Sequence, residues 1–244
     1  ISHSSGFKME TNHNLNEPVL PGQNSSSRTW DAEFTNEKGR GRVALAGFGL
    51  GFLAGIAVLM LAVLPAAAPF WVYLFLLVCF HMLEYLLTAA FRPDVLSFEN
   101  FLLNHSTPYQ VMVLVCWLEY WVEYALVPPS APFVNKQWGV VSSCGVCISF
   151  LGLAARAVAM ATASSNFSHM IEHERRREHE LVTSGIYAVL RHPAYFGFFW
   201  FSVGTQVLLV NPICLAAYSI ASFRFFYERI PYEEQAWLAL SHSA

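Results

Sequence analysis

The segment that organises this chain opens with His179-Glu-Leu-Val-Thr-Ser-Gly-Ile-Tyr187 and continues with Arg191-His-Pro-Ala-Tyr-Phe-Gly197. An apolar run follows, turns at Asn211-Pro212 and ends at Arg229-Ile-Pro-Tyr-Glu-Glu234. Pro193 disfavours helix at the preceding residue and is expected to start a helix itself, so Arg191 and His192 should lie at the N-terminus of that helix. A helix N-terminus favours negative groups. Polar side chains thus gather at both ends of a hairpin of membrane-crossing length, and the pattern predicts an active site at one face of a membrane.

The composition indicates a membrane protein. The 244-residue chain is 55% hydrophobic and 13% charged, whereas a soluble domain carries about 25% charged residues. Several apolar runs approach or exceed the roughly 20 residues that cross a bilayer, so we expect an all-α, polytopic transmembrane bundle of roughly six to eight helices. The net charge of -3 gives no reason to expect a nucleic-acid partner. The five cysteines lie in apolar runs and are expected to be free thiols.

The expected crossings follow from the apolar runs and from the positions of Lys and Arg. The runs cover residues 43–64, 70–91, 109–127, 138–163, 195–210 and 213–227. Basic residues gather before the first run and after the second, fourth and sixth, which predicts that both termini are cytosolic. Gly47, Gly51 and Gly55 in the first run share one helix face, and this pattern predicts close packing against another helix.

Ionisable side chains interrupt the apolar runs. His81 and Glu84 lie on one face of the second run, Glu119 and Glu123 lie one turn apart in the third, and Arg156 lies near the end of the fourth. Such groups are costly inside a membrane and face a partner or a polar interior. We interpret His81 and Glu84 as a hydrogen-bonded pair that ties helices together, with a direct role in a site as the alternative. We interpret Glu119 and Glu123 as structural.

Two patterns resemble metal sites. His169-Met-Ile-Glu-His173 matches the H-x-x-E-H pattern of inverted zinc proteases, and Cys144-Gly-Val-Cys147 has ligand-like spacing. The histidine pattern has no evident third ligand and is followed by a solvated charge run, and the cysteine pair lies mid-span without a second pair. We assign no metal. A charged cytosolic loop that contacts anionic lipid head groups is the alternative for this region.

Five short motifs follow one another within residues 150–235. They are Leu181-Val-Thr-Ser-Gly-Ile-Tyr187, Arg191-His-Pro-x-Tyr-x-Gly197, Gly204-Thr-Gln206, Asn211-Pro212, and Arg224-Phe-Phe-x-x-Arg229-x-x-x-Glu233-Glu234. Together they closely resemble the isoprenylcysteine carboxyl methyltransferase family. The earlier spans agree with that family in hydropathy more than in motif. After Glu234 the sequence departs from the family's usual aromatic-rich continuation.

The resemblance implies an enzyme of the endoplasmic reticulum membrane. Such an enzyme transfers a methyl group from S-adenosylmethionine to the C-terminal carboxylate of prenylated cysteine in processed CaaX proteins, such as small GTPases and lamin-type proteins, and releases S-adenosylhomocysteine. Arg229 would hold the substrate carboxylate as the catalytic residue. The implied cofactor contacts are Glu172, His179, Glu180, Leu181, Val182, Tyr187, His192, Pro193, Ala194, Tyr195 and Glu233.

Composition, hydropathy and the resemblance together divide the chain into three parts. Residues 1–42 are expected to form a disordered polar tail. Residues 43–163 are expected to form transmembrane helices that scaffold a lipid substrate in contact with membrane lipid. Residues 164–244 are expected to form the catalytic, cofactor-binding region with its terminal helical hairpin. The prenyl tail would then enter sideways from the lipid, and the cofactor from the cytosol.

The implied chemistry suits these residue types. A carboxylate is already ionised at neutral pH, so no general base is required. Arginine can bind a carboxylate through two parallel hydrogen bonds and orient it. The methyl donor is a sulfonium cation, so the protein has to align the two groups in a water-poor site.

Other functions fit parts of the sequence. A phospholipid methyltransferase or a sterol reductase could share the terminal helices. A non-catalytic membrane scaffold or a transporter is the alternative from another class, with His81, Glu119, Glu123 and Arg156 as a conduction path. No inverted repeat is visible to support transport.

Overall fold

The computed structural model describes residues 33–242 except positions 37, 105, 129, 132–133 and 169–180, without the side chains beyond residue 235. Within these ranges the regular structure is helical, which confirms the all-α expectation. The long helices are α2 (Arg40–Val63), α3 (Ala68–Phe91), α4 (Thr107–Leu126), α5 (Val140–Ala163), α6 (Pro193–Leu209) and α7 (Pro212–His242). Short 3-10 turns are η1 (Pro65–Ala67), η2 (Pro93–Val95), η3 (Phe98–Phe101), η4 (Ser164–Asn166) and η5 (Gly185–Ala188).

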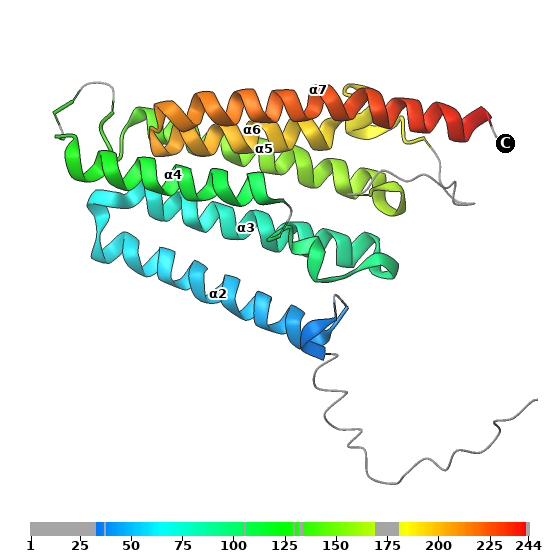
Figure 1. The fold of residues 1–244 in the computed structure, drawn as a ribbon, viewed down its shortest axis with the longest axis horizontal. Helices are drawn as coiled ribbons and strands as arrows, with labels where there is room; N and C mark the ends of the chain where they lie inside the picture. The colour runs from blue at the N-terminus through cyan, green and yellow to red at the C-terminus, as the bar shows by residue number, and fades with distance from the viewer. Residues whose placement is uncertain are drawn as a thin grey trace, which may run out of the picture.

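The long helices lie side by side in alternating directions (Figure 1). At one end of the bundle α2, α4 and α6 begin and α3, α5 and α7 end; we call this the site end. The turns between α2 and α3, α4 and α5, and α6 and α7 lie at the opposite end, which we call the far end. Each expected apolar run falls on one of these helices, and α7 continues well past residue 227.

Three of the described helical segments are long and apolar enough to cross a membrane by length and composition. They are Arg40–Val63, Pro65–Phe91 and Val140–Asn166. Helix α4 carries two carboxylates, and α6 has 17 residues. The number of crossings therefore stays a prediction, while the helical membrane-protein class is confirmed.

Helices α5 and α6 pack backbone against backbone. Four glycines line this contact, Gly145 and Gly152 on α5 and Gly197 and Gly204 on α6. A Cβ atom added at Gly145 would lie 2.1 Å from the backbone nitrogen of Leu208, and at the other three it would lie 2.4 or 2.5 Å from a backbone nitrogen. Small residues are what allow membrane helices to approach this closely. The contact fixes the register of the antiparallel pair and with it the position of the first turn of α6.

A buried lysine joins three segments at the far end. Lys136, in the connection between α4 and α5, is 5% exposed. Its Nζ lies 2.6 Å from Oε2 of Glu123 and donates to the carbonyl oxygen of Val210 and to Oδ1 of Asn211, each at 2.8 Å. The lysine therefore ties α4 to the turn between α6 and α7, and this contact confirms the structural interpretation of Glu123.

Glu119 caps the start of α7. Its two carboxylate oxygens accept hydrogen bonds from the backbone N–H groups of Ile213 and Cys214, each at 2.7 Å. These are among the first N–H groups of α7, which have no partner within the helix. A carboxylate at a helix N-terminus is also favoured by the helix dipole. The structural interpretation of Glu119 is confirmed.

We expect Lys136→Met to lower the free energy of unfolding by about 3 kcal/mol, because it leaves the partly buried Glu123 carboxylate without its cation. The measurement is denaturant or thermal unfolding of the protein purified in detergent. Lys38→Met, at an exposed position before α2, is the matched control and should leave the unfolding midpoint unchanged. Equal midpoints for the two variants would contradict the structural role of Lys136.

Two polar groups of α3 tie this helix to its neighbours. Arg156 of α5 donates to both carboxylate oxygens of Glu84, the Nη2–Oε2 bond being 2.9 Å long, and its Nη1 donates to the carbonyl oxygen of Ala194 at 3.2 Å. Nε2 of His81 lies 3.1 Å from the hydroxyl of Tyr109 on α4. His81 and Glu84 therefore join helices as predicted, but through separate partners rather than as a pair.

Candidate active site

The site end of α6 is shaped by its local sequence. His192 precedes the helix with φ −126° and ψ 62°, and Pro193 is the first helical residue. Pro193 and Ala194 are buried. Just upstream, Gly185 adopts φ +57°, in the left-handed region that glycine tolerates, and a Cβ there would lie 3.0 Å from Cγ2 of Thr162. This turn brings η5, which contains Tyr187, against the end of α5.

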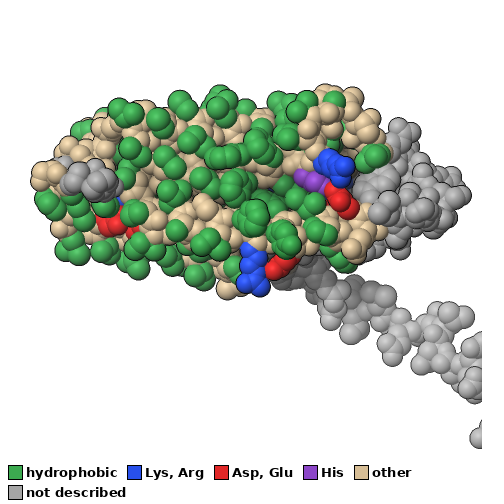
Figure 2. Space-filling model, turned by 90° about the horizontal axis from the view of Figure 1, so that it is seen from above, with side chains coloured by type: hydrophobic (Ala, Val, Ile, Leu, Met, Phe, Trp, Pro, Cys, Tyr) green, Lys and Arg blue, Asp and Glu red, His purple; other side chains and the backbone are tan. Residues whose placement is uncertain are grey.

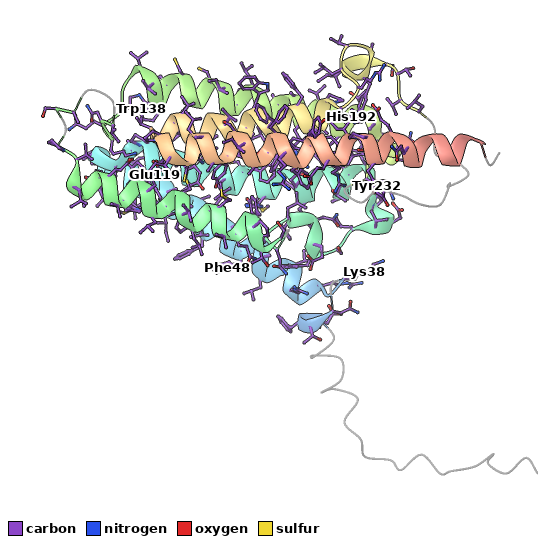
Figure 3. The ribbon with its side chains drawn as sticks, turned by 45° about the horizontal axis from the view of Figure 1, so that its top comes forward. Lys38, Phe48, Glu119, Trp138, His192 and Tyr232 are labelled. Carbon is purple, nitrogen blue, oxygen red and sulfur yellow. The ribbon has the colours of Figure 1, made fainter. Side chains whose placement is uncertain are left out.

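Tyr195 links α6 to α7. Nε of Arg229 donates to the Tyr195 hydroxyl at 2.9 Å, and that hydroxyl donates to Oε2 of Glu233 at 2.7 Å. Arg229 and Glu233 are four residues apart and share one face of α7. The two polar segments that the sequence predicts to meet therefore do meet, at one end of the bundle. Figure 3 shows His192 and Tyr232 at this site end, opposite Glu119 and Trp138 at the far end.

His192 stands in a short stack of rings. Its ring lies parallel to that of Tyr195 with 5.7 Å between centroids, and Tyr195 in turn stacks on Phe226 at 4.9 Å. Nε2 of His192 lies 3.2 Å from Oε1 of Glu234. In the space-filling view, a histidine lies beside acidic and basic side chains on an otherwise largely apolar face (Figure 2). The site thus combines aromatic faces with two carboxylates.

Tyr187 is half-buried and lies near Glu233. Burial, together with the negative charge of the Glu233 carboxylate, raises the pKa of Tyr187 above its ordinary value. The phenol therefore stays protonated throughout the physiological range and can act only in its neutral form. Since the folded-state pKa is the higher one, this protonation stabilises the fold below the ordinary tyrosine pKa of about 10, and that stabilisation is lost as the pH rises through the folded value.

The remaining predicted residues divide into two groups. Leu181 is exposed and Val182 is partly buried, and both approach the site along the chain leading to η5. Glu172, His179 and Glu180 lie outside the described residues, as do His169 and His173 of the zinc-like pattern. Within the described ranges no cluster of three or more His, Cys, Asp or Glu side chains is suited to a metal ion.

A cavity of about 220 Å³ adjoins the site. Arg229 and Tyr195 line its site end, and the rest of its lining is largely aromatic and aliphatic. Pro108 of α4 and Phe225 of α7 belong to the lining and are exposed, so the cavity opens sideways between these two helices. The lining also includes Met112 on α4, Ser202 on α6, and Tyr218, Ala221 and Ser222 on α7.

Comparisons with known proteins agree on one family. The sequence model of the isoprenylcysteine carboxyl methyltransferase family matches residues 145–239. A protein-S-isoprenylcysteine O-methyltransferase of Saccharomyces cerevisiae is 35% identical over 194 residues, which are 79% of this chain and 81% of that protein. The chain belongs to the isoprenylcysteine carboxyl methyltransferase family. A Xenopus laevis protein-S-isoprenylcysteine O-methyltransferase is 43% identical over 193 residues, or 79% of this chain, and the match spans 65% of that protein's length.

A solved structure in the isoprenylcysteine carboxyl methyltransferase family has the same fold. It is described as the eukaryotic intramembrane Ras methyltransferase, and it superposes with a TM-score of 0.78 at 35% identity. The superposition covers 86% of this chain and 74% of that one. The resemblance expected from the five motifs is therefore confirmed, and so is the intramembrane helical class.

The motifs of the isoprenylcysteine carboxyl methyltransferase family do not include the residues that line most of the cavity. Tyr109, Met112 and Tyr218 lie in apolar runs whose hydropathy gives no sign of a cavity. Their helical spacing carries a partial signal, because Tyr218, Ser222 and Arg229 follow one another at intervals of four and seven residues on α7 and so share a face. The sequence could indicate that face, but not which helices lie opposite it.

Proposed function

We propose that this chain transfers a methyl group from S-adenosylmethionine to the C-terminal carboxylate of prenylated cysteine. The observation that carries the proposal is the position of Arg229, which lies where the apolar cavity meets the polar side chains of the site end. A prenylated cysteine has the same division, with a lipid tail on one side and a carboxylate on the other. Membership of the isoprenylcysteine carboxyl methyltransferase family supports the same assignment.

Arg229 would hold the substrate. Its guanidinium can bind a carboxylate through two parallel hydrogen bonds, and its Nε bond to Tyr195 fixes the plane of the group. The substrate carboxylate is ionised at neutral pH, so the site needs no general base. The sideways opening between Pro108 and Phe225 would admit the prenyl tail from the membrane while the carboxylate stays at the site end.

The site end fits a cationic methyl donor. Stacked His192, Tyr195 and Phe226 present aromatic faces, to which cations are attracted. The Glu233 carboxylate lies 2.7 Å from the Tyr195 hydroxyl and would attract the positively charged end of the cofactor. When bound, S-adenosylmethionine supplies an activated methyl group on a sulfonium sulfur. Tyr187, Leu181, Val182, Pro193 and Ala194 would complete the contacts, together with Glu172, His179 and Glu180.

The cellular setting is part of the same proposal. The chain is a membrane protein, and we place it in the endoplasmic reticulum membrane with both termini in the cytosol. Small GTPases and lamin-type CaaX proteins would be its substrates there. The cytosolic side would then be the site end, where the basic residues that flank the helices lie and where a soluble cofactor can arrive.

The decisive assay supplies purified protein in detergent with labelled S-adenosylmethionine and N-acetyl-S-farnesylcysteine. We expect a base-labile methyl ester to form. The matched control is the same thioether with its carboxylate converted to an amide, which should accept no label. Phosphatidylethanolamine as acceptor tests the phospholipid methyltransferase alternative. Absence of ester formation, or label transferred to the phospholipid instead, would overturn the proposal, and the activity should sediment with endoplasmic reticulum membranes.

A further inference from the structure

The side chains that line the cavity beside Arg229 change in size along α7. Ala221 and Ser222, in the middle of its α7 wall, are small, and Ser202 on α6 is a third small lining residue. One turn deeper the wall carries Tyr218. Small side chains at the middle leave room for a chain-like ligand, and the tyrosine ring closes that room. We call the part of the cavity between Arg229 and Tyr218 the bore, and the Tyr218 ring its floor.

The depth of this bore follows from helix geometry. Arg229 and Tyr218 are eleven residues apart on α7, which corresponds to about 16 Å at the helical rise of about 1.5 Å per residue. Helices α4 and α6 run away from the site end, and their deepest lining residues are Met112 and Ser202. Three isoprene units, extended, have a twelve-carbon backbone that spans about 15 Å with carbon–carbon bonds of about 1.5 Å.

The floor rests on packed core rather than on lipid. Tyr218 packs against a cluster of buried residues that includes Tyr73, Cys116 and Leu208. Tyr73 is 2% exposed, Cys116 and Leu208 are 0% exposed, and Nε1 of Trp117 donates to the Tyr73 hydroxyl at 3.3 Å. Closely packed interiors resist the displacement of one side chain by a ligand. The tyrosine ring is therefore held in place from behind.

We propose that Tyr218 is the floor that limits prenyl length in this chain, and that Ser202, Ala221 and Ser222 give the bore its width. This inference rests on the proposed function, since it takes the prenyl tail as the occupant of the cavity. A largely apolar lining with Arg229 at its site end fits such a tail and its carboxylate. The second arginine of the lining, Arg156, is already paired with the Glu84 carboxylate. Three isoprene units fill the bore, and a fourth has to bend or emerge through the sideways opening.

The test compares geranyl, farnesyl and geranylgeranyl thioethers of N-acetylcysteine as methyl acceptors. Ser222 lies seven residues, or about 10 Å, from Arg229, which leaves room for two isoprene units. Ser222→Leu should therefore lower kcat/KM for the farnesyl acceptor at least about tenfold relative to the geranyl acceptor, as expected when a pocket loses the volume of a few methylenes. The matched control is Ala216→Leu, at an exposed position on α7 outside the cavity lining, which should leave this ratio unchanged.

Removing the Tyr218 ring should shift the preference for acceptor length in the opposite direction, toward the longer prenyl chain. Tyr218→Ala should raise the geranylgeranyl-to-farnesyl ratio of kcat/KM about tenfold, because it opens space below the third isoprene unit. Tyr218→Phe keeps the ring and should leave the ratio unchanged, which separates the ring from its hydroxyl.

The outcomes separate the two proposals. Ester formation by the unsubstituted chain, with ratios unmoved by both Ser222→Leu and Tyr218→Ala, would overturn the floor and leave the proposed function standing. No ester from any acceptor would overturn the function itself. If Tyr218→Ala fails to fold, Ser222→Leu alone decides.

Discussion

Arg229→Ala is expected to lower kcat/KM for the methylation of farnesylcysteine about a thousandfold, since an ionised carboxylate left without its cation in a water-poor site costs about 4 kcal/mol. The Tyr195 hydroxyl would lose its donor in the same variant. The measurement is the initial rate of labelled methyl transfer at subsaturating acceptor. Arg229→Lys should recover part of the loss, because lysine keeps the charge but not the bidentate geometry.

The matched control lies five residues earlier on the same helix. Arg224 is highly exposed, and its Nε donates to Oε1 of Glu228 at 2.9 Å on the outer face of α7. Arg224→Ala removes the same charge from α7 without touching the cavity, and its kcat/KM should stay within about twofold of the unsubstituted chain. A similar loss in both variants would mean that overall charge, and not a carboxylate contact, explains the effect.

Gly145→Ala is expected to prevent recovery of the folded protein, although it adds one methyl group. The new Cβ would lie 2.1 Å from the backbone nitrogen and 2.4 Å from the Cα of Leu208. Backbone atoms cannot rotate away as a side chain does, so α5 and α6 would have to separate along their length. We expect a loss of more than about 4 kcal/mol, the range associated with severe overpacking. Size-exclusion chromatography in detergent and the unfolding midpoint measure it.

Gly51→Ala provides the control for this change. It makes the same substitution in α2, where no neighbouring atom lies within 4 Å of the added Cβ. The folded yield and the unfolding midpoint should match or slightly exceed those of the parent chain, because alanine favours helix over glycine by about 1 kcal/mol. Equal tolerance at Gly145 would show that the α5–α6 contact is looser than described.

These glycines show where sequence reasoning reaches its limit. The four-residue repeat of Gly47, Gly51 and Gly55 predicts a packed helix face, yet no atom of the described chain packs on it, so that prediction is wrong for contacts within this chain. The glycines that do pack closely are those of α5 and α6. Within each helix they are seven residues apart, and this spacing forms a less obvious repeat than the four-residue spacing in α2. Periodicity indicates which face can be approached, but not which helix approaches it.

The site itself was more predictable than its surroundings. The polar residues of the α6 and α7 motifs stand out against apolar sequence, so the meeting of Tyr195 with Arg229 and Glu233 could be expected from the hairpin alone. The cavity could not, because a side chain facing lipid and one facing a lipid-binding cavity are apolar alike. The partners of the ionisable side chains could not be predicted either. Glu84 on α3 pairs with Arg156 on α5, and no local sequence pattern links these two helices.

The contacts that Lys136 makes with Glu123, Val210 and Asn211 have a practical consequence for interpreting variants. The turn between α6 and α7 lies at the far end of the bundle, opposite the proposed chemistry, and a lysine from another loop donates to Asn211 in that turn. A survey of inactivating substitutions should therefore return two clusters, one at each end of the bundle. Those around Arg229 should abolish turnover at normal abundance, whereas those around Lys136 should act through reduced abundance, with the remaining molecules retaining normal turnover.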